Sequence, residues 1–213
     1  MDLSALGPYA CFGTVHEPRA AGHAQALACS FSSMSTWDQT FSQIVARGAT
    51  LAPGLSPREL DDLTAATGLA FPPDLASFLS IAVPVGRSWP TWRDTAQLQS
   101  WIDGPLDGII FDVEHNGFWW PAWGARPIAL EDAFALTRRH FSAVPPLTPV
   151  YGHRYLLADP LVAGNPVFSV HQTDVIYYGA DLTRYFEAEF GGLPHAVAVR
   201  GAAPVSFWGE LGA

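Results

Sequence analysis

Residues 55–79 have the sequence LSPRELDDLTAATGLAFPPDLASFL, which carries two helix signals in close succession. Ser56 can accept a hydrogen bond at the start of a helix, Pro57 suits the first helical position, and Glu59 can reach back to the cap. Gly68 is typical of the residue that ends such a helix. The proline pair that follows, with an apolar run behind it, predicts a second helix. The stretch therefore predicts a capped helix pair.

Helix and strand patterns continue on both sides of this pair. Apolar residues at helical spacing predict further helices from Trp37 to Gly48, from Asp94 to a stop at Gly104-Pro105, over 129–141, and from Asp181 to Gly191. Runs rich in β-branched and aromatic residues predict strands at 108–113, 148–151, 154–157, 167–171 and 175–178. Helices first and closely spaced strands later predict an α+β fold, with helices packed on a largely antiparallel sheet. A mixed sheet is the alternative.

Composition and charge narrow the classes of function. The chain has 213 residues, of which 49% are hydrophobic, and a formal charge of −9. A basic stripe, which most nucleic-acid-binding proteins need, is missing from the sequence, so direct binding to DNA or RNA is not expected. No apolar run reaches the roughly 20 residues of a membrane span, and no secretory signal is evident. We therefore expect a cytoplasmic protein without membrane contact.

The first 35 residues differ from the rest of the chain. They are small and polar and show no sustained periodicity, so we expect residues 1–35 to form a flexible N-terminal extension. Cys11 and Cys29 both lie in this segment. Two cysteines without metal-type spacing predict free reduced thiols rather than a disulfide framework.

Four segments together resemble one known family. They are LSPRELDDL (55–63) leading into GLAFPPDLASFL (68–79), SWPTWR (88–93), GIIFDVEHNGFW (108–119) with WGARP (123–127), and VYGHRY (150–155) followed by GNPVFSVHQTDVIYYG (164–179). Their order is similar to that in SMI1/KNR4 (SUKH) superfamily proteins of the bacterial branch, and the resemblance covers about residues 37–190. It predicts that residues 36–213 form a single SMI1/KNR4-like domain.

The resemblance implies a function as well as a fold. It implies a compact α+β domain without a cofactor or a catalytic site. Many bacterial members are immunity proteins that neutralise a polymorphic toxin, often a nuclease, by stoichiometric binding, whereas fungal relatives are regulatory interaction proteins. The acidic charge of this chain fits a basic protein partner, because opposite charge speeds encounter. We expect a non-catalytic immunity-type protein, with a regulatory scaffold as the alternative.

Two groups of polar residues suggest an enzyme instead. Asp112, Glu114, His153 and His171 are the residue types of a metal site, and the rival hypothesis is a small metal-dependent hydrolase that uses them. If 108–113 is a strand, Asp112 and Glu114 face the same side. Ser169, His171 and Asp174 suggest a nucleophilic triad, although no G-x-S-x-G motif surrounds the serine. We expect neither a metal site nor a catalytic residue.

Tryptophans are concentrated in the middle of the chain. Six of them, at positions 89, 92, 101, 119, 120 and 123, fall within 35 residues. Trp101 lies on a helical apolar stripe and is expected in the core. Interfaces are enriched in Trp and Arg, so the others suggest a partner-binding surface. This surface would consist of Trp89, Trp92, Trp120 and Trp123, rimmed by Arg93, Glu114, Asn116 and Arg126. The alternative is that the tryptophans close the core.

Overall fold

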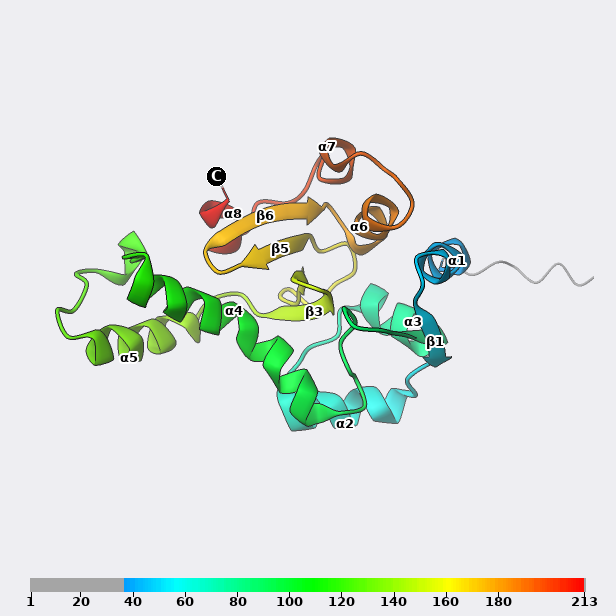
Figure 1. Ribbon diagram of the computed structural model, residues 1–213, viewed down its shortest axis with the longest axis horizontal. Helices are drawn as coiled ribbons and strands as arrows, with labels where there is room; N and C mark the ends of the chain where they lie inside the picture. Colours follow the sequence, from blue (N-terminus) through cyan, green and yellow to red (C-terminus); the bar gives the residue numbers. More distant parts are fainter. Residues whose placement is uncertain (1–36, 213) are drawn as a thin grey trace, which may run out of the picture. The chain divides into compact units, whose positions relative to one another are not determined.

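The computed structural model describes residues 37–212, and these form an α+β fold (Figure 1). The helices are α1 (Asp38–Ala46), α2 (Pro57–Thr67), α3 (Pro73–Ile81), α4 (Thr95–His115), α5 (Leu130–Phe141), α6 (Leu182–Glu189), α7 (His195–Ala198) and α8 (Trp208–Leu211), with a 3-10 turn η1 (Pro121–Trp123). The strands are β1 (Thr50–Pro53), β2 (Ala82–Val85), β3 (Leu147–Tyr151), β4 (Arg154–Leu157), β5 (Val167–His171) and β6 (Asp174–Gly179). The predicted extension at 1–35 and both cysteines lie outside the described residues.

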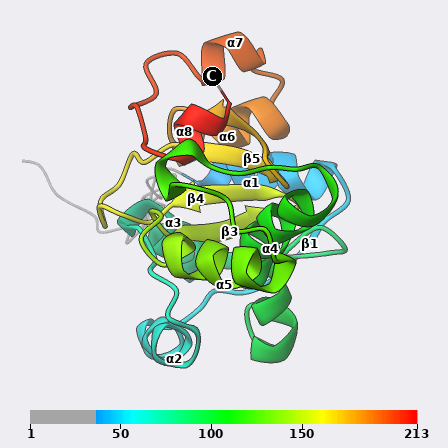
Figure 2. The ribbon, with the colours of Figure 1, turned by 90° about the vertical axis from the view of Figure 1, so that its left-hand side faces the viewer.

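The main sheet confirms the predicted run of late strands. Strands β3, β4, β5 and β6 are neighbours in that order, and every pair is antiparallel. The connections are short enough for hairpins, which explains why the sheet is antiparallel throughout. Helices α6, α7 and α8 gather around the edge strand β6 (Figure 1). Helix α5 packs along α4 (Figure 2).

A second, two-stranded sheet was not predicted from the sequence. Strands β1 and β2 pair antiparallel, with Thr50 opposite Val85 and Pro53 opposite Ala82. Each strand contains a proline, and proline is depleted in strands because it cannot donate to the ladder. The chain passes from α3 directly into β2, and Pro84 lies within this strand opposite Leu51.

The sheet separates two hydrophobic cores. The first core lies among α1, α2, α3 and α6, and the second lies among α4, α5, β6 and α8. Successive side chains of β4 point into different cores, since Leu156 belongs to the first core whereas Tyr155 and Leu157 belong to the second. This is the period-two pattern of a strand that is covered on both faces. It accounts for the apolar, non-alternating sequence of the central strands.

The predicted strand at 108–113 is wrong, because α4 continues through Gly104-Pro105 and ends at His115. A proline inside a helix removes the hydrogen bond to the carbonyl four residues earlier. Here that carbonyl belongs to Trp101, and it accepts a hydrogen bond from the hydroxyl of Tyr155 at 3.0 Å. A side chain on β4 thus replaces the missing bond, and the helix is not interrupted.

The glycines of this segment have a packing role instead of ending the helix. A Cβ atom at Gly104 would lie 3.1 Å from the Tyr155 hydroxyl, and one at Gly108 would lie 2.8 Å from the Cα of Gln172. The absence of side chains lets α4 lie close to β4 and to the β5–β6 turn. The same residues, when taken alone in the sequence, are typical of a turn.

Candidate binding surface

The course of α4 separates the residues that were predicted to form one partner-binding surface. The helix has 21 residues, which at 1.5 Å per residue is a length of about 30 Å. Trp92 and Arg93 precede its first turn, whereas Asn116 and Arg126 follow its last. The residues predicted for this surface therefore do not form a single patch. They belong to two separate ends of one helix, which we call the N-terminal end and the C-terminal end of α4.

Tryptophan burial corrects the prediction further. Trp89 is 6% exposed, Trp92 is 2% exposed and Trp123 is 8% exposed. Trp89 and Trp92 belong to the first core and Trp123 to the second. Tryptophans buried to this degree cannot serve as protruding anchors. For these three, the alternative interpretation that they close the core agrees with the structure.

The C-terminal end of α4 is held by aromatic contacts within the chain. The Trp123 ring stacks on Phe207 at a centroid distance of 6.0 Å and on His140 at 5.7 Å. Trp120 is half-buried and meets Phe207 edge-on at 5.2 Å. The indole N–H of Trp119 donates to the carbonyl of Gly124 at 2.8 Å. Each tryptophan of this loop thus has an internal partner.

Polar residues at the same end also serve the fold. Arg126 donates to the carbonyl of Val113 at 2.8 Å, one of the carbonyls that a helix C-terminus leaves without a helical partner. The Asn116 amide donates to the Asp112 carboxylate at 2.5 Å. Glu114 is exposed and lies 3.7 Å from the ring of His115. Of the predicted rim residues here, only Glu114 lacks a structural task in the described part of the chain.

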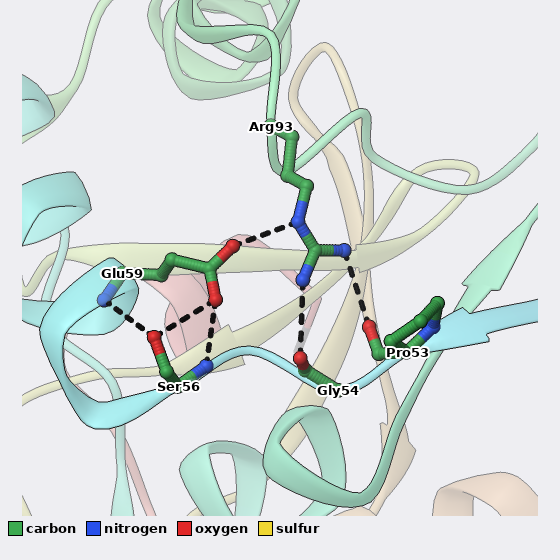
Figure 3. A network of polar contacts seen from close by, with 5 residues as sticks. All are labelled: Pro53, Gly54, Ser56, Glu59 and Arg93. Atoms are coloured by element: carbon green, nitrogen blue, oxygen red, sulfur yellow. Dashed lines mark hydrogen bonds and ion pairs between the residues drawn. The ribbon is translucent and has the colours of Figure 1, made fainter.

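The N-terminal end of α4 is organised around Arg93 (Figure 3). Its guanidinium donates to the Glu59 carboxylate at 2.8 Å and to the carbonyls of Pro53 and Gly54 at 3.1 and 3.0 Å. Glu59 also completes the predicted capping box, because its carboxylate accepts from the Ser56 N–H while its own N–H donates to the Ser56 hydroxyl. The hydrogen bond from Arg93, followed by those from Ser56, lowers the pKa of Glu59 to about 2. Glu59 is therefore an ionised carboxylate held in a fixed orientation.

A groove lies beside this network, between α2 and the start of α4. It encloses about 410 Å³ and is lined by Leu55, Glu59, Asp62, Leu63, Ala66, Trp92, Arg93 and Thr95. Apolar atoms of Leu55, Leu63 and Trp92 form its buried floor. Glu59 and Asp62 supply carboxylates at its rim. We call this feature the α2–α4 groove.

The surroundings of the α2–α4 groove are acidic. Residues 56–67 and 93–107 together contain six carboxylates and two arginines. Both arginines are already paired, Arg93 with Glu59 at 2.8 Å and Arg58 with Asp62 at 3.8 Å. The Arg58–Asp62 pair is highly exposed, so it is weak and readily exchanged for another cation. An apolar floor with an acidic rim suits a side chain that is cationic at its tip and aliphatic along its stem.

The residues of the suggested hydrolase site occupy different environments. On a helix Asp112 and Glu114 point about 200° apart rather than to the same side. Asp112 is 2% exposed, and its carboxylate accepts hydrogen bonds from the Thr173 N–H at 2.8 Å, from the Thr173 hydroxyl and from Asn116. Burial raises the pKa of Asp112, but these bonds and nearby His171 outweigh it and hold the pKa below its usual range. Asp112 thus fastens α4 to the β5–β6 turn.

The histidines of that hypothesis lie near each other without forming a ligand set. The rings of His153 and His171 are 6.2 Å apart between centroids. The pKa of His153 is lowered by burial, by Arg154 and by His171. Within residues 37–212, no group of three or more His, Cys, Asp and Glu side chains is arranged to hold a metal ion.

The suggested nucleophilic triad is also not assembled. The Ser169 hydroxyl accepts from Arg154 at 3.0 Å. His171 and Asp174 face each other across the β5–β6 hairpin. Among the side-chain hydrogen bonds of the described residues, none joins any two of Ser169, His171 and Asp174. The three residues therefore serve strand pairing.

Sequence reasoning named Trp92 and Arg93 but missed the other half of the groove. Leu55, Glu59 and Asp62 belong to the stretch that predicts the capped helix pair, and the sequence assigns them no binding role. The adjacent carboxylates of Asp61 and Asp62 could have indicated a binding role. They follow a complete capping box, so the helix does not need them to form. This signal could not be used, because nothing local indicates that residues 92–95 lie against α2.

Comparisons with known proteins add no further assignment. No helix among residues 37–212 is long and apolar enough to cross a membrane. No family model, no curated protein and no solved structure shows a significant match to this chain. The resemblance to SMI1/KNR4 proteins stays a prediction from the sequence.

Proposed function

We propose that the protein is a non-catalytic binding domain of the immunity type, which neutralises a basic toxin domain by stoichiometric binding. The observation that supports this proposal is the α2–α4 groove, where an apolar floor meets acidic rim residues at the N-terminal end of α4. The function needs no reacting group. It needs a preformed surface that is complementary to the partner in shape and in charge.

The groove favours a lysine or arginine side chain of the partner. The aliphatic stem of such a side chain would pack over Leu63 and Trp92, and its charged tip would reach Asp62 and Glu59. Hydrogen bonds between charged groups are shorter and stronger than those between neutral groups. Glu59 is already oriented by Arg93 and Ser56, so little side-chain entropy is lost on binding.

The experiment that tests the proposal begins with affinity capture from the native host and identification of the bound proteins by mass spectrometry. The expected partner is a basic toxin domain, purified in turn and assayed for its own activity. Inhibition should be complete at a molar ratio of one to one. A partner that is a host regulator would assign the regulatory role instead, and a partner whose activity is not inhibited at any ratio would contradict the immunity proposal.

Two adjacent aspartates of α2 provide a matched pair of variants. Asp62→Lys reverses a charge at the groove, whereas Asp61→Lys makes the same change on an exposed position that does not line it. We expect at least a tenfold loss of affinity for Asp62→Lys and a smaller loss, due to long-range steering alone, for Asp61→Lys. Equal losses in the two variants would show that only net charge matters and that the groove is not the contact.

A further inference from the structure

A second cavity has the opposite electrostatic character. It encloses about 140 Å³ between α1, the segment after β2 and the end of β3, and its lining contains two arginines, Arg47 and Arg87, and no acidic residue. In a chain with a formal charge of −9, two cations beside one cavity are an exception to the average surface.

Neither arginine has a partner within the described part of the chain. Among residues 37–212, no carboxylate or carbonyl bonds to the guanidinium of Arg47 or Arg87. Arg93, Arg126 and Arg154, by contrast, each donate to specific acceptors. The helix dipole favours a cation at Arg47, which caps the C-terminus of α1. The helix dipole does not explain the arginine at position 87, because Arg87 lies in the loop after β2.

The backbone holds both arginines in place at the cavity. Arg47 donates its N–H to the carbonyls of Gln43 and Ile44 at 3.2 and 3.1 Å. The loop that carries Arg87 is closed by a bond from Trp89 to Gly86 at 3.1 Å, and the carbonyl of Ser88 accepts from Gly152 at 2.7 Å. Binding therefore requires reorientation of two side chains and not of the loops.

Three aromatic rings complete the lining. Trp89 lies 4.7 Å from Tyr151 and 5.7 Å from Phe190 between centroids, and Tyr151 lies 5.2 Å from Phe190. Trp89 and Phe190 are both buried. A low-polarity wall strengthens the attraction between a guanidinium and an anion, because it reduces screening by water. At about 30 Å³ per water molecule, the cavity has room for roughly five waters, which suits one oxyanion group rather than a whole nucleotide.

We propose that Arg47 and Arg87 form a binding site for a single oxyanion group, a phosphate or a carboxylate, against the Trp89–Tyr151–Phe190 wall. Arginine suits such a group because its planar fork matches the geometry of the oxygens. The site is separate from the α2–α4 groove in lining and in charge, so it does not depend on the proposed function.

Titration of the full chain with inorganic phosphate and, separately, with acetate tests the proposal by two-dimensional NMR. We expect saturable shifts of the Gly48 and Ser88 amides and of the Arg47 and Arg87 side-chain N–H signals. Saturation by phosphate alone assigns a phosphate site, saturation by acetate alone assigns a carboxylate site, and saturation by both assigns a general oxyanion site. Shifts that only grow in proportion to concentration, as with sodium chloride at matched ionic strength, would overturn the proposal.

Variants give an independent readout. Arg47→Gln and Arg87→Gln are exposed changes that leave the wall intact, and each should weaken saturable binding about tenfold. Arg138→Gln, on the exposed surface of α5, is the control and should leave it unchanged. Unchanged binding in both cavity variants would show that the anion binds elsewhere, which also overturns the proposal.

Discussion

The two ends of helix α4 are built from the same kinds of residue, but they use them differently. At the C-terminal end, Trp123 and Arg126 turn inward, to Phe207 and to the carbonyl of Val113. At the N-terminal end, Trp92 forms a buried floor below a groove, and Arg93 orients a carboxylate at its rim. Tryptophan and arginine are therefore not sufficient to identify a binding surface. What distinguishes the ends is whether charged groups remain available beside apolar surface.

The largest expected effect concerns the aromatic packing at the C-terminal end. Trp123→Ala removes a ring that contacts Phe207 and His140 and should lower the free energy of unfolding by about 3–5 kcal/mol. Partner binding at temperatures where the variant is folded should not change. Denaturant unfolding and titration with the partner provide the two measurements. Loss of affinity in folded protein, without loss of stability, would reverse the roles of the two ends.

The next largest effect concerns the buried carboxylate of α4. Asp112→Ala leaves the N–H and hydroxyl of Thr173 without their acceptor and should cost about 3 kcal/mol in the free energy of unfolding at neutral pH. The pKa of Asp112 is lower in the folded protein than its usual value, so the stabilisation is present above about pH 4. It is lost as the pH falls through the folded-state pKa. The difference in the free energy of unfolding between the two proteins should therefore narrow as the pH is lowered from 7 toward 2.

Two buried tyrosines give a comparison inside the cores. Tyr155→Phe removes the donor to the Trp101 carbonyl, which Pro105 leaves without a helical partner, and should destabilise the protein by about 1–2 kcal/mol. The Tyr185 hydroxyl is buried without a hydrogen-bond partner among residues 37–212. Tyr185→Phe should therefore leave the free energy of unfolding unchanged or slightly higher. Equal destabilisation of both variants would show that the Tyr155 bond does not support α4.

The smallest expected effect on stability lies at the rim of the groove. Arg93→Met keeps the aliphatic stem but removes the donors to Glu59, Pro53 and Gly54, all at an exposed position. The melting temperature should change little, whereas the pKa of Glu59 should rise from about 2 toward its usual value. NMR titration of the Glu59 carboxyl measures this shift. A pKa that stays near 2 would mean that the Ser56 bonds alone orient the carboxylate.

Local chemistry was sufficient to predict much of the fold. The capping box of Ser56 and Glu59, the cap at Asp181 and the four late strands are all encoded within a few residues. The prediction for residues 104–113 was wrong because the glycines and the proline of this stretch contact residues that are distant in the sequence. Tyr155 lies 50 residues after Pro105, and no local pattern shows that its hydroxyl replaces the lost helical bond.

The candidate site was predictable only in part for the same reason. Trp92 and Arg93 were identified by type, but their grouping with Trp120, Trp123 and Arg126 followed from their closeness in sequence. An uninterrupted helix of 21 residues separates the two groups in space. The partner of Arg93 is Glu59, which lies 34 residues earlier in the chain. This ion pair depends on the tertiary structure, so no local sequence pattern predicts it.

The measurement that tests the central claim most directly is an NMR map of the complex with the partner. Amide and indole N–H signals of the free and bound protein report which end of α4 is in contact. The account predicts that α2 and Trp92 shift on binding, while Trp119, Trp120 and Trp123 keep their positions. Shifts confined to residues 116–128, with α2 and Trp92 unchanged, would contradict it.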